Sequence, residues 1–363
     1  MKKKIFFVLP SLFGGGAEKV VLTIVKHIDK EKFDPTLVLL NSNGSYPVPK
    51  DTKVIDLNVQ RARYGIFKVA GLLKKEKPDI VFSTLGHLNL LMSMIRVFFG
   101  KDIRFIARES NTVSMENQTQ RFTKLFDFLY KTFYNNFDTI ITQCNYMKKD
   151  LVENYGIKSK KITMIYNPVD IEMIENNISQ EATYTLPKNK INLIAAGRLS
   201  RQKGFDILIE AMSMLDEKYH LTILGEGEEA QNLQTLVQKH NLQKQITFAG
   251  FQKNPHKIIK QSNLFILSSR YEGLPNILLE ANACGIGVVA FDTPGGTAEI
   301  IEEGKNAILL KQTTPKALAQ GIQKATQIDF DSQKIKEMIK QRFNVKKIIK
   351  EYEKVFIKTS SCK

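Results

Sequence analysis

The 363-residue chain is 43% hydrophobic and 25% charged, a composition typical of a globular protein with room for two domains. No apolar run reaches the ~18 residues of a membrane helix, and three scattered cysteines exclude a disulfide framework and indicate thiols of a reducing cytoplasm. The formal net charge of +16 suits a lysine-rich surface, a phosphate-bearing substrate or an anionic membrane. Nucleic acid is not expected, because basic clusters interleaved with aromatic residues are absent from the sequence.

Short apolar runs alternate with helical patterns along the chain. Two successive series of this kind predict two doubly wound parallel sheets rather than one barrel. We place the boundary between them at residues 167–170 and the polar stretch up to 189, where regular patterning lapses. Residues 334–358 form a long basic helical pattern with an expected interruption near Phe343. The strand-like runs are 5–9, 36–40, 80–83, 103–107 and 139–142 in the first half, and 191–196, 220–224, 246–248, 264–267 and 287–291 in the second.

A glycine loop at residues 13–18 follows the first strand and offers backbone amides at a helix start. A dinucleotide fingerprint beginning at Gly14 would require glycine or alanine at position 19, which is lysine. The second strand also ends at Leu40 and Asn41, without the acidic residue that holds a ribose in that motif. The sequence therefore argues against a dehydrogenase.

Three loops in the second half carry glycine and charge directly after a strand. Arg198 and Lys203 follow the first of these strands, and together they suit a diphosphate that gains charge as it leaves. Residues 225–228 follow the next strand, and residues 268–275 follow a third. Because ligands of open α/β sheets bind beyond the carboxyl ends of the strands, the three loops predict one shared site.

The stretch from residue 268 to 281 combines a strand end, a glycine turn and a helix start. Gly273 supplies the turn, and Pro275 stands at the expected first helical position. Backbone amides there favour an anion, whereas Glu272 and Glu280 would repel phosphate and grip hydroxyl groups at its edges. A ligand with a phosphate centre and hydroxylated ends is a nucleotide sugar. The alternative is that Glu272 is a solvated loop carboxylate and Glu280 a charge favoured at a helix start.

The sequence closely resembles glycosyltransferase family four, the retaining transferases of the GT-B fold, over nearly its whole length. Residues 167–170 resemble the interdomain stretch of that family. The first glycine loop is a weak match, while the pair Glu272 and Glu280 with the basic residues of the second half is a specific one. The matching motifs are Gly197-Arg198-Leu199 with Lys203-Gly204, Gly225-Glu226-Gly227, Ala249-Gly250, Ser269 with Glu272-Gly273, Glu280-Ala281, and Gly295-Gly296 with Glu299.

This resemblance implies an α/β fold of two Rossmann-like domains with a cleft between them and a final helix that crosses back to the first domain. The first domain, residues 1–168 plus 344–363, would bind the acceptor. The second, residues 169–343, would bind the nucleotide sugar. Neither a metal nor another cofactor is expected, because basic side chains take the place of a metal.

The resemblance also implies roles for single residues. Arg198 and Lys203 would bind the diphosphate, Glu280 the ribose hydroxyls, and Glu272 with the following amides the donor sugar. We therefore expect Arg198, Lys203 and Glu272 to be catalytic. The other expected substrate-binding positions are Gly14, Gly15, Gly16, Gly225, Gly250, Gly273, Leu274, Pro275 and Asn276.

The sequence departs from the family pattern where many relatives place a histidine near the sugar. The corresponding stretch, residues 107–111, contains none. We therefore assign the sugar-side catalytic role to Glu109 and a contact with an acceptor phosphate to Arg108. His87 lies on an earlier loop, where a histidine is more often structural than catalytic.

We thus expect a cytoplasmic, retaining hexosyltransferase that moves a sugar from a nucleotide diphosphate, with UDP the expected carrier, to a glycan acceptor for bacterial surface polysaccharide. The positive charge favours a lipid-linked acceptor and peripheral attachment to the inner face of the cell membrane. Residues 121–131 either lie at that anionic surface or pack their phenylalanines inside the domain. The alternatives are a GT-B epimerase and a non-catalytic, basic membrane-binding protein. The sequence leaves the sugar, the base, the linkage and the oligomeric state open.

Overall fold

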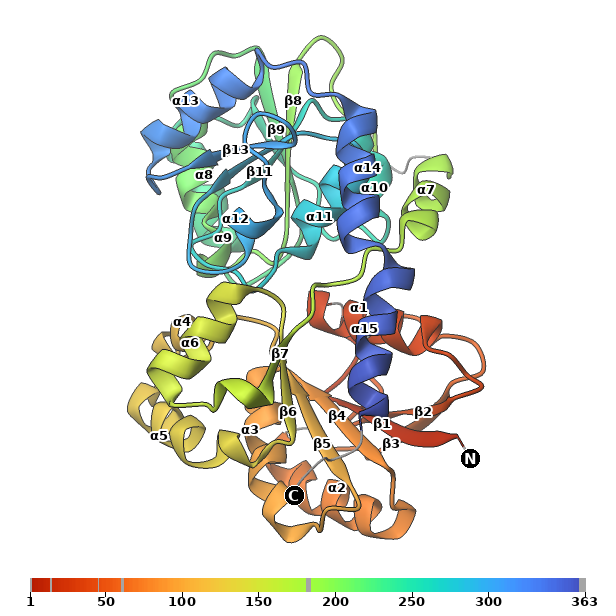
Figure 1. The fold of residues 1–363 in the computed structure, drawn as a ribbon. Helices are drawn as coiled ribbons and strands as arrows, with labels where there is room; N and C mark the ends of the chain where they lie inside the picture. The colour runs from red at the N-terminus through yellow and green to blue at the C-terminus, as the bar shows by residue number, and fades with distance from the viewer. Residues whose placement is uncertain (1, 14, 45, 60–61, 181–183, 359–363) are drawn as a thin grey trace. The chain divides into compact units, whose positions relative to one another are not determined.

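The structure is a computed structural model that describes residues 2–13, 15–44, 46–59, 62–180 and 184–358 (Figure 1). The chain divides into two compact units, Met1–Pro168 with Val345–Lys363 and Val169–Asn344. Each unit is built around one parallel β-sheet, which explains why the sequence carries two successive strand–helix series. Within the described ranges, no helix combines the length and apolarity needed to cross a lipid bilayer.

The first unit contains a seven-stranded parallel sheet in the order β3-β2-β1-β4-β5-β6-β7. β1 lies where the strand order reverses, paired with β2 on one side and β4 on the other. Its side chains alternate between the two faces, so that Phe7 enters one hydrophobic cluster and Phe6 the other. The strands are β1 Lys3–Leu9, β2 Phe33–Leu39, β3 Lys53–Asp56, β4 Ile80–Thr84, β5 Arg104–Arg108, β6 Thr139–Thr142 and β7 Ile162–Met164.

Helices cover both faces of this sheet. α1 and the last helix, α15, pack on the face of Phe7, where the ring of Phe356 lies 6.1 Å from the ring of Phe7 and 5.8 Å from that of Phe82. The predicted crossing of the final helix to the first domain is confirmed. The helices are α1 Gly16–His27, α2 Ala62–Glu76, α3 Gly86–Ile95, α4 Val113–Gln118, α5 Thr123–Phe133, α6 Asn145–Tyr155 and α15 Val345–Ile357, with short 3-10 turns η1 Arg96–Phe98, η2 Tyr134–Asn136 and η3 Ser159–Lys161.

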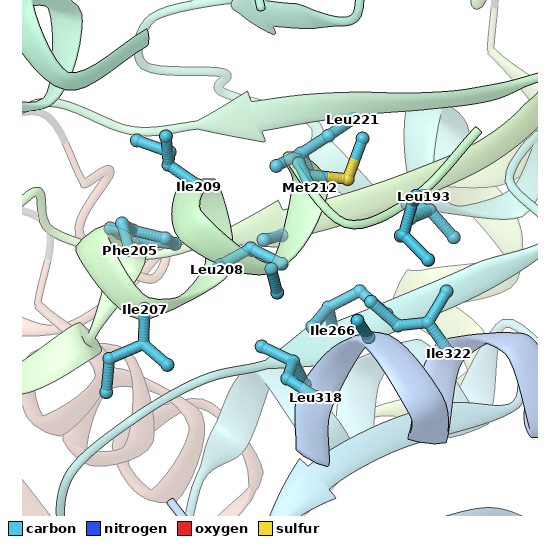
Figure 2. Packing of buried hydrophobic residues seen from close by; sticks show 14 of the residues in the cluster. Leu193, Phe205, Ile207, Leu208, Ile209, Met212, Leu221, Ile266, Leu318 and Ile322 are labelled. Carbon is cyan, nitrogen blue, oxygen red and sulfur yellow. The ribbon is translucent and has the colours of Figure 1, made fainter. Parts of the chain in front are cut away.

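The second unit repeats the architecture with a six-stranded parallel sheet in the order β10-β9-β8-β11-β12-β13. β8 is paired with β9 on one side and β11 on the other, so the order reverses at β8. Leu193 and Ile266, from these neighbouring strands, lie in one hydrophobic cluster with Leu208 and Leu318 of the covering helices (Figure 2). The strands are β8 Ile191–Ala196, β9 Tyr219–Leu224, β10 Ile246–Phe248, β11 Leu264–Leu267, β12 Val288–Phe291 and β13 Ala307–Leu310.

The helices of the second unit also form two layers. α8, α9 and α13 cover the face shown in Figure 2, and α10, α11 and α14 pack together in the other layer. The helices are α7 Ile171–Ser179, α8 Phe205–Met212, α9 Ala230–Lys239, α10 Pro255–Lys260, α11 Asn276–Ala283, α12 Thr297–Ile300, α13 Pro315–Ala325 and α14 Ser332–Phe343, and the 3-10 turn η4 spans Arg201–Lys203.

The prediction of two doubly wound parallel sheets is confirmed, and the interruption expected near Phe343 falls at Asn344, between α14 and α15. The expected lapse of regular structure up to residue 189 is wrong at α7. Asp170 begins that helix by accepting a hydrogen bond from the Met173 amide at 3.0 Å, an N-cap that the sequence analysis overlooked. Three short strands were not predicted either, namely β3, β7 and β13.

Candidate active site

Two loops of the second unit meet where its strand order reverses. One follows β8 and spans residues 197–204; the other follows β11 and spans residues 268–275. In open parallel sheets this reversal leaves a crevice at the carboxyl ends of the strands, which is where ligands bind. The two predicted clusters of charge and glycine therefore lie at the place where the fold favours a ligand site.

Lys203 and Glu272 contact each other across these two loops. The Lys203 Nζ atom lies 2.6 Å from Glu272 Oε1, and both side chains are largely buried. The hydroxyl of Ser269 donates a second hydrogen bond of 2.6 Å to the same oxygen. The structure thus brings together the residue predicted to bind the diphosphate and the residue predicted to bind the sugar. Arg198 lies on the first loop with its side chain exposed to solvent.

Backbone and side-chain hydrogen bonds fix the two loops to each other. Ser268 Oγ donates to the Lys203 carbonyl at 2.9 Å, and the Arg270 amide donates to the Gln202 carbonyl at 2.8 Å. The Gln202 side chain returns a bond of 3.0 Å to the Tyr271 carbonyl. These bonds hold Lys203 on a rigid support rather than on a mobile loop.

Arg270 adds an ion pair that sequence reasoning missed. Its guanidinium donates to both oxygens of Asp206, at 2.8 and 2.6 Å, and so joins the second loop to the start of α8. Burial by itself would raise the pKa of Asp206, but the hydrogen bond and charge of Arg270 outweigh it and hold that pKa below its ordinary value. In the sequence, Arg270 is one arginine within residues 268–281, and an arginine alone is too common to indicate a role.

Two glycines, Gly204 in the loop after β8 and Gly225 in the loop after β9, are required by close backbone approach. A Cβ at Gly225, whose φ is +134°, would lie 1.9 Å from the Gly197 carbonyl oxygen. A Cβ at Gly204, whose φ is +62°, would lie 2.1 Å from the Ser268 carbonyl oxygen. The Gly225 amide also donates to the Gly250 carbonyl at 2.8 Å. Packing of loop on loop therefore accounts for Gly225, whereas Gly250 meets no close neighbour and is favoured by its φ of +67°. Substrate binding by the two glycines stays a prediction.

The glycine turn before α11 is held from the side of β12. The Glu272 amide donates to the Pro294 carbonyl at 2.9 Å, and the Gly296 amide donates to the Gly273 carbonyl at 2.6 Å. Pro275 precedes the helix instead of occupying its first position, which is Asn276. Leu274 and Pro275 are buried, so they can serve a ligand only through their backbone. The turn thus presents the start of α11 next to Glu272.

Glu280 lies on the second turn of α11 and is held by a histidine. Its Oε2 atom is 3.0 Å from Nε2 of His256, a buried residue of α10. The other ring nitrogen of His256 is 3.1 Å from the Asn177 amide nitrogen. Neither partner was predicted, because no local motif connects them with Glu280.

The first unit also has a glycine loop where its strand order reverses. Gly15 precedes α1 and Gly16 is its first residue, while Gly14 falls outside the described residues. A Cβ at Gly15 would lie 2.3 Å from Glu18 Oε2, so the buried Glu18 side chain lies over the start of its own helix. A role for Gly14, Gly15 and Gly16 in substrate binding stays a prediction.

Arg108 and Glu109 follow each other at the carboxyl end of β5, and both are only 1% exposed. Arg108 donates to Asn167 Oδ1 at 2.5 Å, Tyr352 Oη at 3.3 Å and Thr84 Oγ1 at 3.4 Å. Its guanidinium therefore ties β5 to α15 and to the segment after β7. The acceptor-phosphate contact predicted for Arg108 gains no support from this placement, since those three bonds engage it inside the first unit.

Glu109 is a buried acid. Asn89 donates to its Oε1 at 3.3 Å, and its Oε2 has no hydrogen-bond partner among the described residues. Burial, reinforced by the charge of Glu116, raises the pKa of Glu109 to about 8. With this pKa, Glu109 is mainly neutral at pH 7. Its role as an anion beside the sugar stays a prediction, and it would require the buried acid to lose its proton. His87, by contrast, is exposed as the second residue of α3.

A separate hollow of about 410 Å³ lies at the amino-terminal end of the first sheet. It is lined by Lys2, Lys3, Glu31, Lys32 and Phe33, at or just before the starts of β1 and β2, and by Ile357 at the end of α15. Because ligands of parallel sheets bind at the opposite, carboxyl edge, we do not assign this hollow to the active site.

Family models and relatives agree with this geometry. The model of the Glycosyltransferase Family 4 domain matches residues 14–173, and that of the Glycosyl transferases group 1 domain matches residues 177–342. An uncharacterized glycosyltransferase of Methanocaldococcus jannaschii is 30% identical over 328 residues, covering 86% of this chain and 81% of the relative. This chain belongs to glycosyltransferase family 4.

Two further comparisons place this glycosyltransferase among related enzymes. It is 29% identical over 331 residues to the N-acetylgalactosamine-N,N'-diacetylbacillosaminyl-diphospho-undecaprenol 4-alpha-N-acetylgalactosaminyltransferase of Campylobacter jejuni, covering 88% of this chain and 89% of that protein. The structure of Anabaena Alr3699/HepE in complex with UDP-glucose matches it with a TM-score of 0.78 at 20% identity, covering 97% of this chain and 98% of the other. The second likeness confirms the predicted GT-B fold.

Proposed function

We propose that this glycosyltransferase retains the anomeric configuration of a UDP-linked sugar and transfers that sugar, without a metal ion, to a lipid-linked glycan acceptor. The observation that carries the proposal is the contact between Lys203 and Glu272 where the second sheet reverses its strand order. A buried ion pair is weak evidence for stability, because the cost of desolvating two charges offsets their attraction, whereas a cation beside a hydroxyl-binding acid suits a sugar diphosphate.

The donor would bind with its diphosphate on Lys203 and Arg198 and its ribose on Glu280. The sugar hydroxyls would then reach Glu272 and the amides at the start of α11. Before the donor arrives, Lys203 is neutralised by Glu272. The diphosphate therefore competes with a carboxylate for that cation, and the sugar hydroxyls replace the contact that Glu272 gives up.

The reaction breaks the bond between the anomeric carbon and the diphosphate oxygen and forms a bond from that carbon to an acceptor oxygen. In retention the acceptor hydroxyl arrives on the face that the diphosphate leaves. The hydroxyl proton can then pass to the departing phosphate oxygen, so no side-chain base is required. Lys203 and Arg198 stabilise the charge that grows on the diphosphate, which is the larger part of the catalytic task.

The acceptor assignment rests on a relative. The Campylobacter jejuni enzyme is named for a sugar acceptor linked through diphosphate to undecaprenol. Its likeness spans most of both chains and supports a lipid-linked acceptor. The pathway is supported by other relatives, an amylovoran biosynthesis glycosyltransferase of Erwinia amylovora and a lipopolysaccharide core biosynthesis glycosyltransferase of Rhizobium meliloti. We therefore propose a place in bacterial surface polysaccharide synthesis, at the inner face of the cell membrane. The first unit would bind the acceptor and the second unit the donor.

The helix α5 offers a surface for that membrane. Phe122 just before it is 59% exposed, and Leu125 and Phe128 are 52% and 60% exposed. Phe126 and Leu129 of α5 pack against the core of the first unit. The sequence left two alternatives for residues 121–131, membrane contact and internal packing. The exposed Phe122, Leu125 and Phe128 suit the first, and Phe126 and Leu129 suit the second. Its exposed basic residues are Arg121, Lys124 and Lys131.

Ligand binding and product analysis test the enzymatic proposal. A thermal-shift screen against UDP-, GDP- and ADP-linked sugars should give a rise in melting temperature with the UDP series. Product formed with excess EDTA should carry an α linkage from an α-linked donor, as read by NMR of the anomeric proton. An inverted anomer or a strict metal requirement would refute the mechanism. Free UDP released together with an altered sugar, without acceptor, would favour the epimerase instead.

Vesicle binding tests the membrane surface. The double variant F122S/F128S should bind anionic vesicles at least tenfold more weakly than wild type, and wild-type binding should fall between ~50 and ~500 mM salt. F251S is the matched control, because Phe251 is a similarly exposed phenylalanine of the second unit. Equal binding by the double variant and F251S would refute the assignment of α5.

A further inference from the structure

Three side chains from three helices of the second unit form a chain of hydrogen bonds that ends on Glu280. The Asn177 amide nitrogen, on α7, lies 3.1 Å from Nδ1 of His256 on α10. Nε2 of the same imidazole lies 3.0 Å from Oε2 of Glu280 on α11. His256 is only 2% exposed, so the imidazole makes both contacts away from bulk water, whereas Asn177 and Glu280 are half-buried.

The two contacts define the proton on the imidazole. An amide nitrogen can only donate, so Nδ1 of His256 accepts the bond from Asn177. A neutral imidazole then carries its proton on Nε2 and donates it to the Glu280 carboxylate. The main chain at Asn177 is held by Asn254, whose side-chain amide nitrogen donates to the Asn177 backbone carbonyl at 2.8 Å. The donating amide of Asn177 therefore determines that His256 donates its proton toward Glu280.

We propose that His256 is a positioning residue for the donor nucleotide, which orients the Glu280 carboxylate toward the ribose hydroxyls. This inference rests on the proposed function, in which Glu280 binds the ribose. It adds a residue that acts through Glu280 and touches no substrate atom itself.

The physical reason lies in the freedom of a glutamate side chain. Glu280 has several rotatable bonds, and ordering them on binding costs affinity. The hydrogen bond that His256 donates to one carboxylate oxygen of Glu280 fixes the plane of the carboxylate before the nucleotide arrives. A carboxylate has about four lone-pair positions, so it can accept from His256 and from ribose hydroxyls at the same time.

The test compares two ligands that differ only at the ribose, UDP and 2′,3′-dideoxy-UDP. Wild type should bind UDP more tightly than the dideoxy compound. The Kd of 2′,3′-dideoxy-UDP divided by the Kd of UDP measures the contribution of the ribose hydroxyls. H256F removes the donor and keeps the ring, and it should reduce this ratio about tenfold by weakening UDP alone. H256Q keeps a donor at a similar reach and should hold the ratio within about twofold of wild type. In turnover, H256F should raise the donor KM and leave kcat nearly unchanged.

A matched control is available in the same unit. His220 is also buried and hydrogen-bonded to one side chain, Thr247 Oγ1 at 3.1 Å, but at the amino-terminal start of β9. H220F should leave the ratio unchanged. Should H256F fold poorly, N177L is a second test. It leaves the imidazole in place but removes the hydrogen bond that keeps the proton on Nε2. N177L should therefore also lower the ratio.

The outcomes separate this inference from the function on which it rests. Wild-type protein that binds none of UDP, GDP and ADP overturns the proposed function, and this inference with it. Wild-type protein that binds UDP, together with H256F and N177L variants of unchanged ratio, overturns the inference alone. An equal loss of both ligands in H256F gives His256 a purely structural role and also overturns it.

Discussion

Replacing Glu109 by glutamine removes one ionisable proton from the interior of the first unit and nearly preserves the shape of the side chain. Burial raises the pKa of this acid from its ordinary 4.5 to about 8 in the folded state. Between those pH values the folded protein holds one proton that the unfolded chain has released. Stability from this group is therefore fully present below pH 4.5 and is lost as the pH rises toward 8.

The size of the effect follows from the same two values. Each pH unit within that interval lowers the free energy of unfolding by about 1.4 kcal/mol. From pH 5 to pH 8 the wild-type protein should thus lose about 4 kcal/mol that E109Q keeps. E109Q should be close to wild type at pH 5 and clearly more stable at pH 8.

A urea titration followed by hydrogen exchange and mass spectrometry of peptides from residues 1–168 isolates the first unit from the second. E153Q is the matched control, because Glu153 is an exposed acid of the same unit and should show no such trend. A difference between E109Q and wild type that is constant from pH 5 to pH 8 would refute the reasoning, since Glu109 would then be ionised throughout.

Three further substitutions test the second unit. K203A should lower turnover by roughly 10²–10³ and weaken donor binding less, whereas the exposed Lys305 should tolerate K305A; normal turnover in K203A would remove Lys203 from the mechanism. E280Q should raise the donor KM more than it lowers kcat, and a collapse of kcat alone would indicate a chemical role. G225A should lower thermal stability by at least about 2 kcal/mol because its Cβ would meet the Gly197 carbonyl, while G71A, with open space around it, should be neutral or slightly stabilising; equal melting temperatures would contradict the packing account.

Most of the strands that the sequence predicted are buried on both faces. Such runs stand out as continuous apolar segments, as at β8 and β11. β3 escaped detection because it is an edge strand with three exposed residues among its four, so burial left no pattern in the sequence.

The contacts of the candidate site also differ in whether the sequence could predict them. The meeting of Lys203 and Glu272 could be predicted, because both follow strands whose carboxyl ends share one edge of a sheet. The contact of His256 with Asn177 could not, since 79 residues separate them and only the packing of α7 on α10 brings them together. The burial of Arg108 and Glu109 was likewise hidden, because two charged residues at a strand end are ordinarily expected at the surface.

The position of α15 has a consequence for how the protein is made. Val345, Ile348, Tyr352 and Phe356 complete one face of the core of the first unit, yet they are synthesised after all of residues 169–344. At translation rates of roughly 5–20 residues per second, that face waits about 10–35 s for its last helix. The first unit therefore cannot complete its core before the second unit has been synthesised, although it begins at the amino terminus. A purified chain truncated after residue 344 should accordingly be protease-resistant in the second unit and sensitive in the first.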